Sequence, residues 1–222
     1  MPSKKTKLSA PETPQKRNFV KREAIDFGFN VAKQNILFFL GIFVIWAFAT
    51  IISSTVRGSL DDNRQFLISF LFSLLMWVVS SIISMGIINI SLMFAENKKP
   101  ELKDIFYTQK VFNFILMSII RTIIVIGGFI LFIVPGIILS IKFSFADYLI
   151  VDKKLDAIAS LKKSWEITKG VKANLFIFRI LLGLINVVGF LCLLLGLLVT
   201  VPLTMVASAY VYKKLLSQTN LK

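Results

Sequence analysis

The chain has 222 residues; 56% of them are hydrophobic, 17% are charged, and the mean hydropathy is +0.77. Because soluble domains hold about 45–50% apolar residues, this composition excludes an ordinary soluble fold and predicts a membrane protein. The net charge of +14 does not indicate a nucleic-acid partner, since the 26 Lys and Arg residues flank apolar runs.

The N-terminal end predicts a tail followed by a membrane domain. Residues 1–18 are polar and basic and contain three prolines, which is typical of a disordered cytoplasmic tail. Residues 19–33 mix apolar and charged positions, and we expect a short helix on the membrane surface that leads into the first span. The membrane domain is expected over residues 19–217.

Long uncharged runs predict how often the chain crosses the membrane. About 20 apolar residues cross a hydrocarbon core of about 30 Å, and the apolar runs supply six such segments. The predicted fold class is therefore all-α, a polytopic helical membrane bundle with six transmembrane helices and amphipathic interfacial helices. The six spans are expected at about 35–54, 67–94, 111–134, 137–151, 174–196 and 199–215.

Proline and glycine predict the turns between the later spans. Pro135 and Gly136 interrupt an apolar run, as a turn at the far face of the membrane would. The 15-residue segment after them, 137–151, would be about 22 Å long as a helix, so a short span and a re-entrant segment are both open. We favour the span, because the loops on its two sides differ in charge. The 40-residue apolar block 173–212 must fold back, and the turn is expected near Gly196 to Pro202.

The segment 153–169 predicts an amphipathic helix on the cytoplasmic surface of the membrane. Lysines border its apolar face, which is typical of a helix in the headgroup layer. Asp152 is the expected N-cap and Gly170 the expected stop. The apolar face consists of Leu155, Ile158, Leu161 and Trp165.

The distribution of basic residues predicts the orientation in the membrane. With six spans, 21 of the 26 Lys and Arg residues lie on one side and only two on the other. Because Lys and Arg accumulate in cytoplasmic loops, the N- and C-termini of this multi-pass cell-membrane protein are both predicted to be cytoplasmic.

Four charged residues fall within the predicted spans and form the candidate intramembrane polar cluster. An ionisable side chain in hydrocarbon costs at least about 2.5 kcal/mol, so it suggests a functional site unless it pairs. Two interpretations stay open: a pair that fixes helix packing, and a path or site for a polar ligand or ion. The four residues are Arg121, Lys142, Asp147 and Arg179.

One stretch of the sequence resembles a known family. Residues 131–170 join Pro135 and Gly136 to a short aromatic-rich span that ends in Leu-Ile-Val-Asp, and then to a helix with Ser164 before Gly170. In these features the chain resembles the membrane domain attached to some bacterial glycerophosphoryl diester phosphodiesterases, and related stand-alone membrane proteins of unknown function. The resemblance implies a six-span bundle in the bacterial cytoplasmic membrane. It implies no phosphodiesterase activity, because the catalytic domain of those enzymes is a separate soluble unit.

The side chains available argue against catalysis. The sequence contains no histidine, which excludes Cys–His and Ser–His–Asp arrangements and removes the commonest metal ligand. We therefore expect no enzyme activity, no cofactor and no metal site. The expected partners are the lipid bilayer, anionic phospholipid headgroups and a membrane or cytoplasmic protein, and no nucleic acid.

Two functions remain after this exclusion. The first is a non-catalytic membrane scaffold or partner-binding module. The alternative is a small transporter, channel or lipid-handling protein that uses Arg121, Asp147 and Arg179. A dry, fully paired cluster would favour the scaffold, and an accessible cavity lined by Arg121 and Asp147 would favour the alternative.

Overall fold

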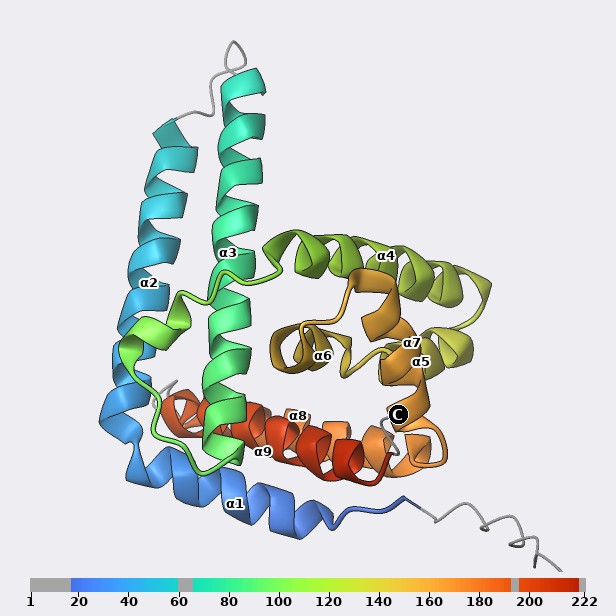
Figure 1. The fold of residues 1–222 in the computed structure, drawn as a ribbon. Coiled ribbons are helices and arrows are strands. Elements are labelled where there is room, and N and C mark those ends of the chain that lie inside the picture. Colours follow the sequence, from blue (N-terminus) through green and yellow to red (C-terminus); the bar gives the residue numbers. More distant parts are fainter. Residues whose placement is uncertain (1–16, 60–65, 193–195, 220–222) are drawn as a thin grey trace, which may run out of the picture.

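The computed structural model describes residues 17–59, 66–192 and 196–219, and this part of the chain is helical and contains no strand. The predicted tail, residues 1–18, lies almost entirely outside the described residues. Figure 1 shows α2 and α3 as a long hairpin beside the group formed by the later helices. The elements are α1 (Lys21–Gln34), α2 (Ile36–Ser59), α3 (Phe66–Ala95), the 3-10 helix η1 (Leu102–Ile105), α4 (Val111–Leu131), α5 (Ile133–Lys142), α6 (Ala146–Lys153), α7 (Ala157–Thr168), α8 (Lys172–Leu191) and α9 (Leu197–Ser217).

Five helical segments of the described chain are long and apolar enough to cross a membrane. They coincide with the first five predicted spans, which confirms the all-helical class and is compatible with a membrane location. The helix at the sixth predicted span, α9, is not one of the five; it lies in the packed centre, with ten buried residues. The five segments are Ile36–Thr55, Leu67–Ala95, Val111–Leu131, Ile133–Lys153 and Lys172–Leu191.

Helix α1 packs along α9 through small side chains. Ala24, Gly28 and Ala32 recur every fourth residue and are buried, so one narrow stripe of α1 lies in the contact. A Cβ atom on Gly28 would lie 2.4 Å from the carbonyl oxygen of Leu203, so only glycine allows this approach. The first helix therefore covers the central helix with its small residues, while Phe29 stays exposed.

The turn between α4 and α5 lies at Phe132, so the prediction that Pro135 and Gly136 form it is wrong. Phe132 is extended (φ −165°, ψ 156°), and α5 begins at Ile133. Pro135 lies in the first turn of α5, where its missing N–H has no helical partner to lose. Gly136 allows close packing on α4, because a Cβ there would lie 2.5 Å from the ring of Phe129.

The fourth predicted span consists of two short helices. Helix α5 ends at Lys142, α6 begins at Ala146, and the residues between them form a break. The hydroxyl of Ser164 in α7 bridges this break: it accepts a hydrogen bond from the N–H of Phe145 (3.1 Å) and donates one to the carbonyl of Lys142 (2.8 Å). Backbone groups that leave the helical pattern are thus satisfied by a neighbouring helix.

The chain folds back between Leu191 and Leu197, so the turn predicted near Gly196 to Pro202 lies at its Gly196 end, and Pro202 is not a span-breaking turn. Pro202 is buried inside α9, and a proline is tolerated there because neighbouring helices cover the backbone that it leaves unbonded. The return depends on glycine instead. A Cβ on Gly196 would lie 2.5 Å from the carbonyl oxygen of Gly189, so the two helix ends approach more closely than larger residues allow.

The boundaries of α7 differ from the predicted helix 153–169. Lys154 adopts a left-handed conformation (φ 53°) that ends α6, and Asp156, not Asp152, precedes the first residue of α7. Gly170 follows the helix with φ +88°, as expected for a stop.

The predicted apolar face of this helix is not the face that the fold buries. Leu161 is buried, but Ile158 and Trp165 are exposed, and Leu155 precedes the helix. Small and hydroxyl side chains contact the rest of the protein because they fit between α7 and the broken α5–α6 segment. The buried residues are Ala157, Ser160, Leu161, Ser164, Ile167 and Thr168.

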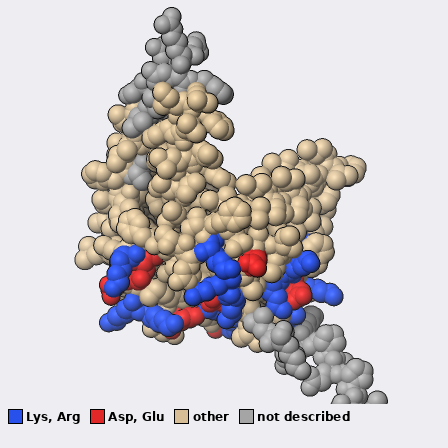
Figure 2. Space-filling view, turned by 45° about the horizontal axis from the view of Figure 1, so that its top comes forward, with Lys and Arg blue, Asp and Glu red and all other residues tan. Residues whose placement is uncertain are grey.

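Charged side chains gather at one end of the molecule. On the face shown in Figure 2 they form a band at the base, while the α2–α3 hairpin and the α4–α5 lobe rise from it as uncharged surface. The same view shows the surface hollowed between these two lobes. Such a one-sided distribution is compatible with apolar helices that enter a membrane from a basic surface.

Candidate functional site

The candidate site centres on an ion pair between α4 and α6. Nη1 of Arg121 donates a hydrogen bond to Oδ2 of Asp147, and the two side chains keep 29% and 18% of their surface exposed. Asp147 lies in the first turn of α6, where free N–H groups and the helix dipole stabilise a carboxylate. The break before α6 therefore creates the position that this carboxylate occupies.

Arg179 of α8 lies beside the pair. Its Nη2 donates to the carbonyl oxygen of Ser144, in the break before α6, at 3.4 Å. The residue is exposed and lines the same cavity as the ion pair. The structure thus brings together three of the four predicted residues, with two guanidinium groups against one carboxylate.

Lys142 is the predicted residue that does not join this group. Its Nζ lies 3.3 Å from the centroid of the Trp165 ring, a cation–π contact on the side of α7. The sequence placed Lys142 in the cluster because it shares the apolar run with Asp147. The break between α5 and α6 lies between Lys142 and Asp147, so the two side chains point to different parts of the protein.

A cavity of 530 Å³ lies beside the three charged residues, and all three line it. Two polar atoms in its wall, Oδ1 of Asp147 and Oγ of Ser144, are buried without a hydrogen-bond partner among the described residues. Buried polar atoms are normally hydrogen-bonded, so these atoms offer free positions to a bound molecule. The other lining residues are Ile88, Thr122, Val125, Ile126, Ser140, Tyr148 and Ser208.

Sequence reasoning missed the uncharged polar residues of this wall. Ser144, Tyr148 and Ser208 come from two distant segments, and a hydroxyl in an apolar run gives no signal in hydropathy. Ser144 lies in the break between α5 and α6, so a prediction of that break would have pointed to it. Only the packing of α9 against α6 could reveal Ser208.

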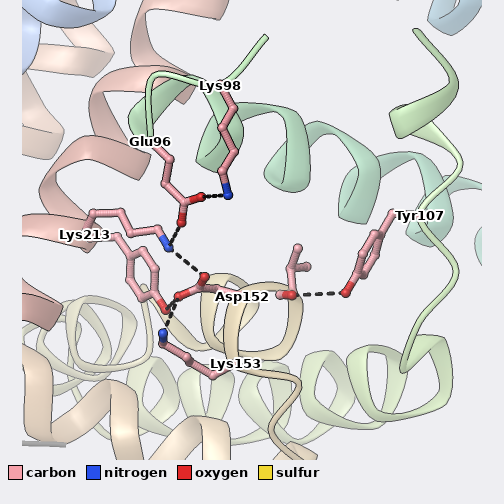
Figure 3. Close-up of polar contacts among 8 residues, drawn as sticks. Glu96, Lys98, Tyr107, Asp152, Lys153 and Lys213 are labelled. Atoms are coloured by element: carbon pink, nitrogen blue, oxygen red, sulfur yellow. Dashed lines mark hydrogen bonds and ion pairs between the residues drawn. The ribbon is translucent and has the colours of Figure 1, made fainter. Parts of the chain in front are cut away.

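A second polar network joins the charged ends of three helices (Figure 3). Lys213 of α9 donates to Glu96, just beyond α3, at 2.5 Å and to Asp152 of α6 at 2.6 Å. The hydrogen bonds from Lys213 and then from Lys98 lower the pKa of Glu96 to about 2. Tyr212 donates to Asp152 at 2.9 Å. This network fixes the three helix ends relative to one another.

Aromatic rings connect the network with the cavity. Tyr148, which lines the cavity, stacks on Tyr212 with ring centroids 5.2 Å apart. Phe145 packs against both rings, at 6.0 Å and 5.7 Å. The cavity wall and the charged network therefore share one aromatic cluster.

Comparison with known sequences gives a family. A domain family described as a domain of unknown function, DUF7847, matches residues 31–219, which is most of the chain. The chain belongs to this family. The DUF7847 segment includes every residue that lines the cavity, from Ile88 to Ser208, so the cavity is a feature of the domain itself.

The other comparisons add no relative. No curated protein and no solved structure matches the chain. The match to DUF7847 shows no link to the glycerophosphoryl diester phosphodiesterases that residues 131–170 resemble.

Proposed function

We propose that this member of the DUF7847 family is a multi-pass membrane protein that binds a polar ligand in the cavity between α4, α6 and α8, and that it acts as a lipid-handling protein or small transporter. The observation that carries the proposal is an accessible cavity lined by two arginines and one carboxylate. In its wall, Oδ1 of Asp147 and Oγ of Ser144 are buried without a hydrogen-bond partner among the described residues. A scaffold needs no such cavity, because a packing role is best served by a dry and fully paired cluster.

The proposed membrane arrangement has six spans. Helix α9 crosses the bilayer inside the bundle, where other helices shield its less apolar residues from lipid. An even number of spans places both termini on the cytoplasmic side, together with the lysine-bearing helix ends. The resemblance of residues 131–170 to a bacterial six-span membrane domain supports this arrangement and a location in the cytoplasmic membrane.

The proposed activity is binding and not catalysis. The chain has no histidine, and the charged residues of the cavity are an arginine pair and a carboxylate that is already paired. Arginine stays protonated near neutral pH, so it does not serve there as a general acid or base. The cavity therefore offers recognition of charge without a group suited to general acid–base chemistry.

The test is to identify what the protein retains on purification. The full chain, Arg179→Gln and Arg22→Gln are purified from native membranes in mild detergent, and bound small molecules are identified by mass spectrometry. Arg22 lies in α1 with its side chain 91% exposed, so its variant controls for loss of one positive charge. We expect at least one species that the wild type and Arg22→Gln retain and Arg179→Gln loses. The same set of molecules on all three proteins would contradict the proposed function.

A further inference from the structure

The charges around the cavity select the charge of the ligand. Arg121 and Asp147 neutralise each other. Among the described residues, Arg179 donates a hydrogen bond to the uncharged carbonyl of Ser144, at 3.4 Å. One positive charge is therefore left over. Because an unbalanced charge is costly within a membrane, the best-matched ligand carries a single negative charge.

The geometry of arginine narrows the chemistry of that charge. A guanidinium group has five N–H donors in a planar fork, and it pairs best with oxyanions such as phosphate or carboxylate, which accept two bonds at once. Within the described part of the chain Arg179 uses one of these donors, on Ser144, which leaves the others for a ligand. A phosphate diester carries one negative charge, which balances that of Arg179, and two acceptor oxygens, which can take two hydrogen bonds from the guanidinium group.

The free atoms of the wall require a donor on the same ligand. Oδ1 of the ionised Asp147 is an acceptor, and Oγ of Ser144 both donates and accepts. A hydroxyl group on the ligand would satisfy Asp147. An ammonium group would meet the same carboxylate, but it would also face Arg121 and Arg179 and would restore the unbalanced charge.

The cavity is oriented for a lipid from the lysine-bearing side. Arg179 lies seven residues from the start of α8, about 10 Å along the helix, and Arg121 lies ten residues from the start of α4, about 15 Å. Val125 and Ile126, one turn further into α4, supply an apolar wall beyond the charges. A headgroup at the arginines would thus direct its acyl chains away from the charged end.

We infer that the cavity binds a phospholipid whose headgroup is a singly charged phosphate diester with a free hydroxyl group. Arg179 binds the phosphate oxygens, and Asp147 and Ser144 bind the hydroxyl. This inference rests on the proposed function and names the ligand class of the same site.

The test compares four lipids on the full-length protein in detergent, with bound lipid counted by native mass spectrometry. Phosphatidylglycerol has the single negative charge and the hydroxyl group, and phosphatidylmethanol has the charge without the hydroxyl. Phosphatidylethanolamine has a hydrogen-bond donor without net charge, and phosphatidylcholine has neither a donor nor a net charge. We expect phosphatidylglycerol to bind at least tenfold more tightly than either zwitterionic lipid. The affinity of phosphatidylmethanol should lie between that of phosphatidylglycerol and those of the zwitterionic lipids. Equal binding of phosphatidylcholine or phosphatidylethanolamine would overturn the inference, and this series needs no variant to fold.

Variants and a soluble competitor locate the site and the source of the phosphate. Arg179→Gln should lose at least tenfold in phosphatidylglycerol binding, and Arg22→Gln should lose none. Inorganic phosphate should not compete at concentrations comparable to those of the lipid; effective competition would show that the site takes a soluble oxyanion and would overturn the lipid assignment. If phosphatidylglycerol binds no better than the zwitterionic lipids while native membranes yield another molecule that only Arg179→Gln loses, the inference falls and the proposed function stands. If Arg179→Gln retains everything that the wild type binds, both fall.

Discussion

Asp147 has two oxygens in different situations. Oδ2 accepts from Arg121, whereas Oδ1 is buried without a partner among the described residues. The ion pair therefore does not use the whole hydrogen-bonding capacity of the carboxylate. The charged residues of the site could be predicted from the sequence because charges stand out in apolar runs, but their geometry could not, since it depends on a break between two helices.

Replacing the two members of the ion pair tests whether they stabilise the fold together. Asp147→Asn and Arg121→Leu should each lower the free energy of unfolding, because each leaves a charge without its partner. The double variant should lose less than the sum of the two, by about 0.5–3 kcal/mol. Unfolding in detergent measures all four proteins, and strictly additive losses would show that the pair contributes nothing.

The exposed pair Arg22–Asp26 is the matched control for this cycle. Its atoms are 3.6 Å apart, and its side chains are 91% and 63% exposed. Because exposed pairs are screened by water and salt, Arg22→Leu and Asp26→Asn should show no coupling.

Glu96 is predicted to make the stability of the folded protein depend on pH in the acid range. Its pKa is lowered from 4.5 to about 2 by hydrogen bonds from Lys213 and Lys98. A lowered pKa means that this carboxylate stabilises the folded state fully above about pH 4.5, and that the contribution disappears as the pH falls toward 2. Thermal unfolding of the wild type in detergent should therefore shift downward between these values.

The variant Glu96→Gln separates this effect from general acid denaturation. It should be less stable than the wild type at pH 7, and the difference between the two should shrink as the pH falls through that interval. Glu101→Gln removes an exposed carboxylate 2.7 Å from Lys103 and is the control. A constant difference between Glu96→Gln and the wild type would contradict the prediction.

At the scale of elements, the break between α5 and α6 is the feature that builds the site. Uncharged length was enough to predict the apolar segments to within a few residues of their ends, since length is what hydrocarbon requires. The turns could not be predicted as well. Proline and glycine mark a change of backbone, but Pro135 lies in the first turn of α5 and Pro202 lies inside α9.

Ser164 is predicted to hold the break in place. Ser164→Ala removes two hydrogen bonds to backbone groups of the break and should lower the free energy of unfolding by about 1–3 kcal/mol, because those groups are left unsatisfied. Ser160 is equally buried in the same helix, but its hydroxyl donates only within its own turn, to Ala157. Ser160→Ala should therefore cost much less, and equal losses in detergent unfolding would contradict this role.

At the scale of the whole molecule, the charges visible on the face in Figure 2 form a band at the base, and uncharged lobes rise from it. The distribution of Lys and Arg along the sequence predicts this polarity, because six spans place 21 of the 26 basic residues on the same side. The burial of α9 could not be predicted. Its length predicts a span like the others, although it is less apolar than the five segments that could cross a membrane, and its contacts with α1, α3 and α8 place it at the centre.

The most direct test of a bundle that enters the membrane from one charged side uses thiol labelling in intact cells. Cys192 is exposed directly after α8, and Lys169 is exposed directly after α7 in a lysine-bearing segment. The proposed six spans place these two positions on opposite sides of the membrane. We predict that a membrane-impermeant maleimide labels Cys192 in intact cells, and that it labels Lys169→Cys, in a Cys192→Ser background, only after the cells are lysed. Labelling of both positions from the same side of the membrane would contradict the arrangement.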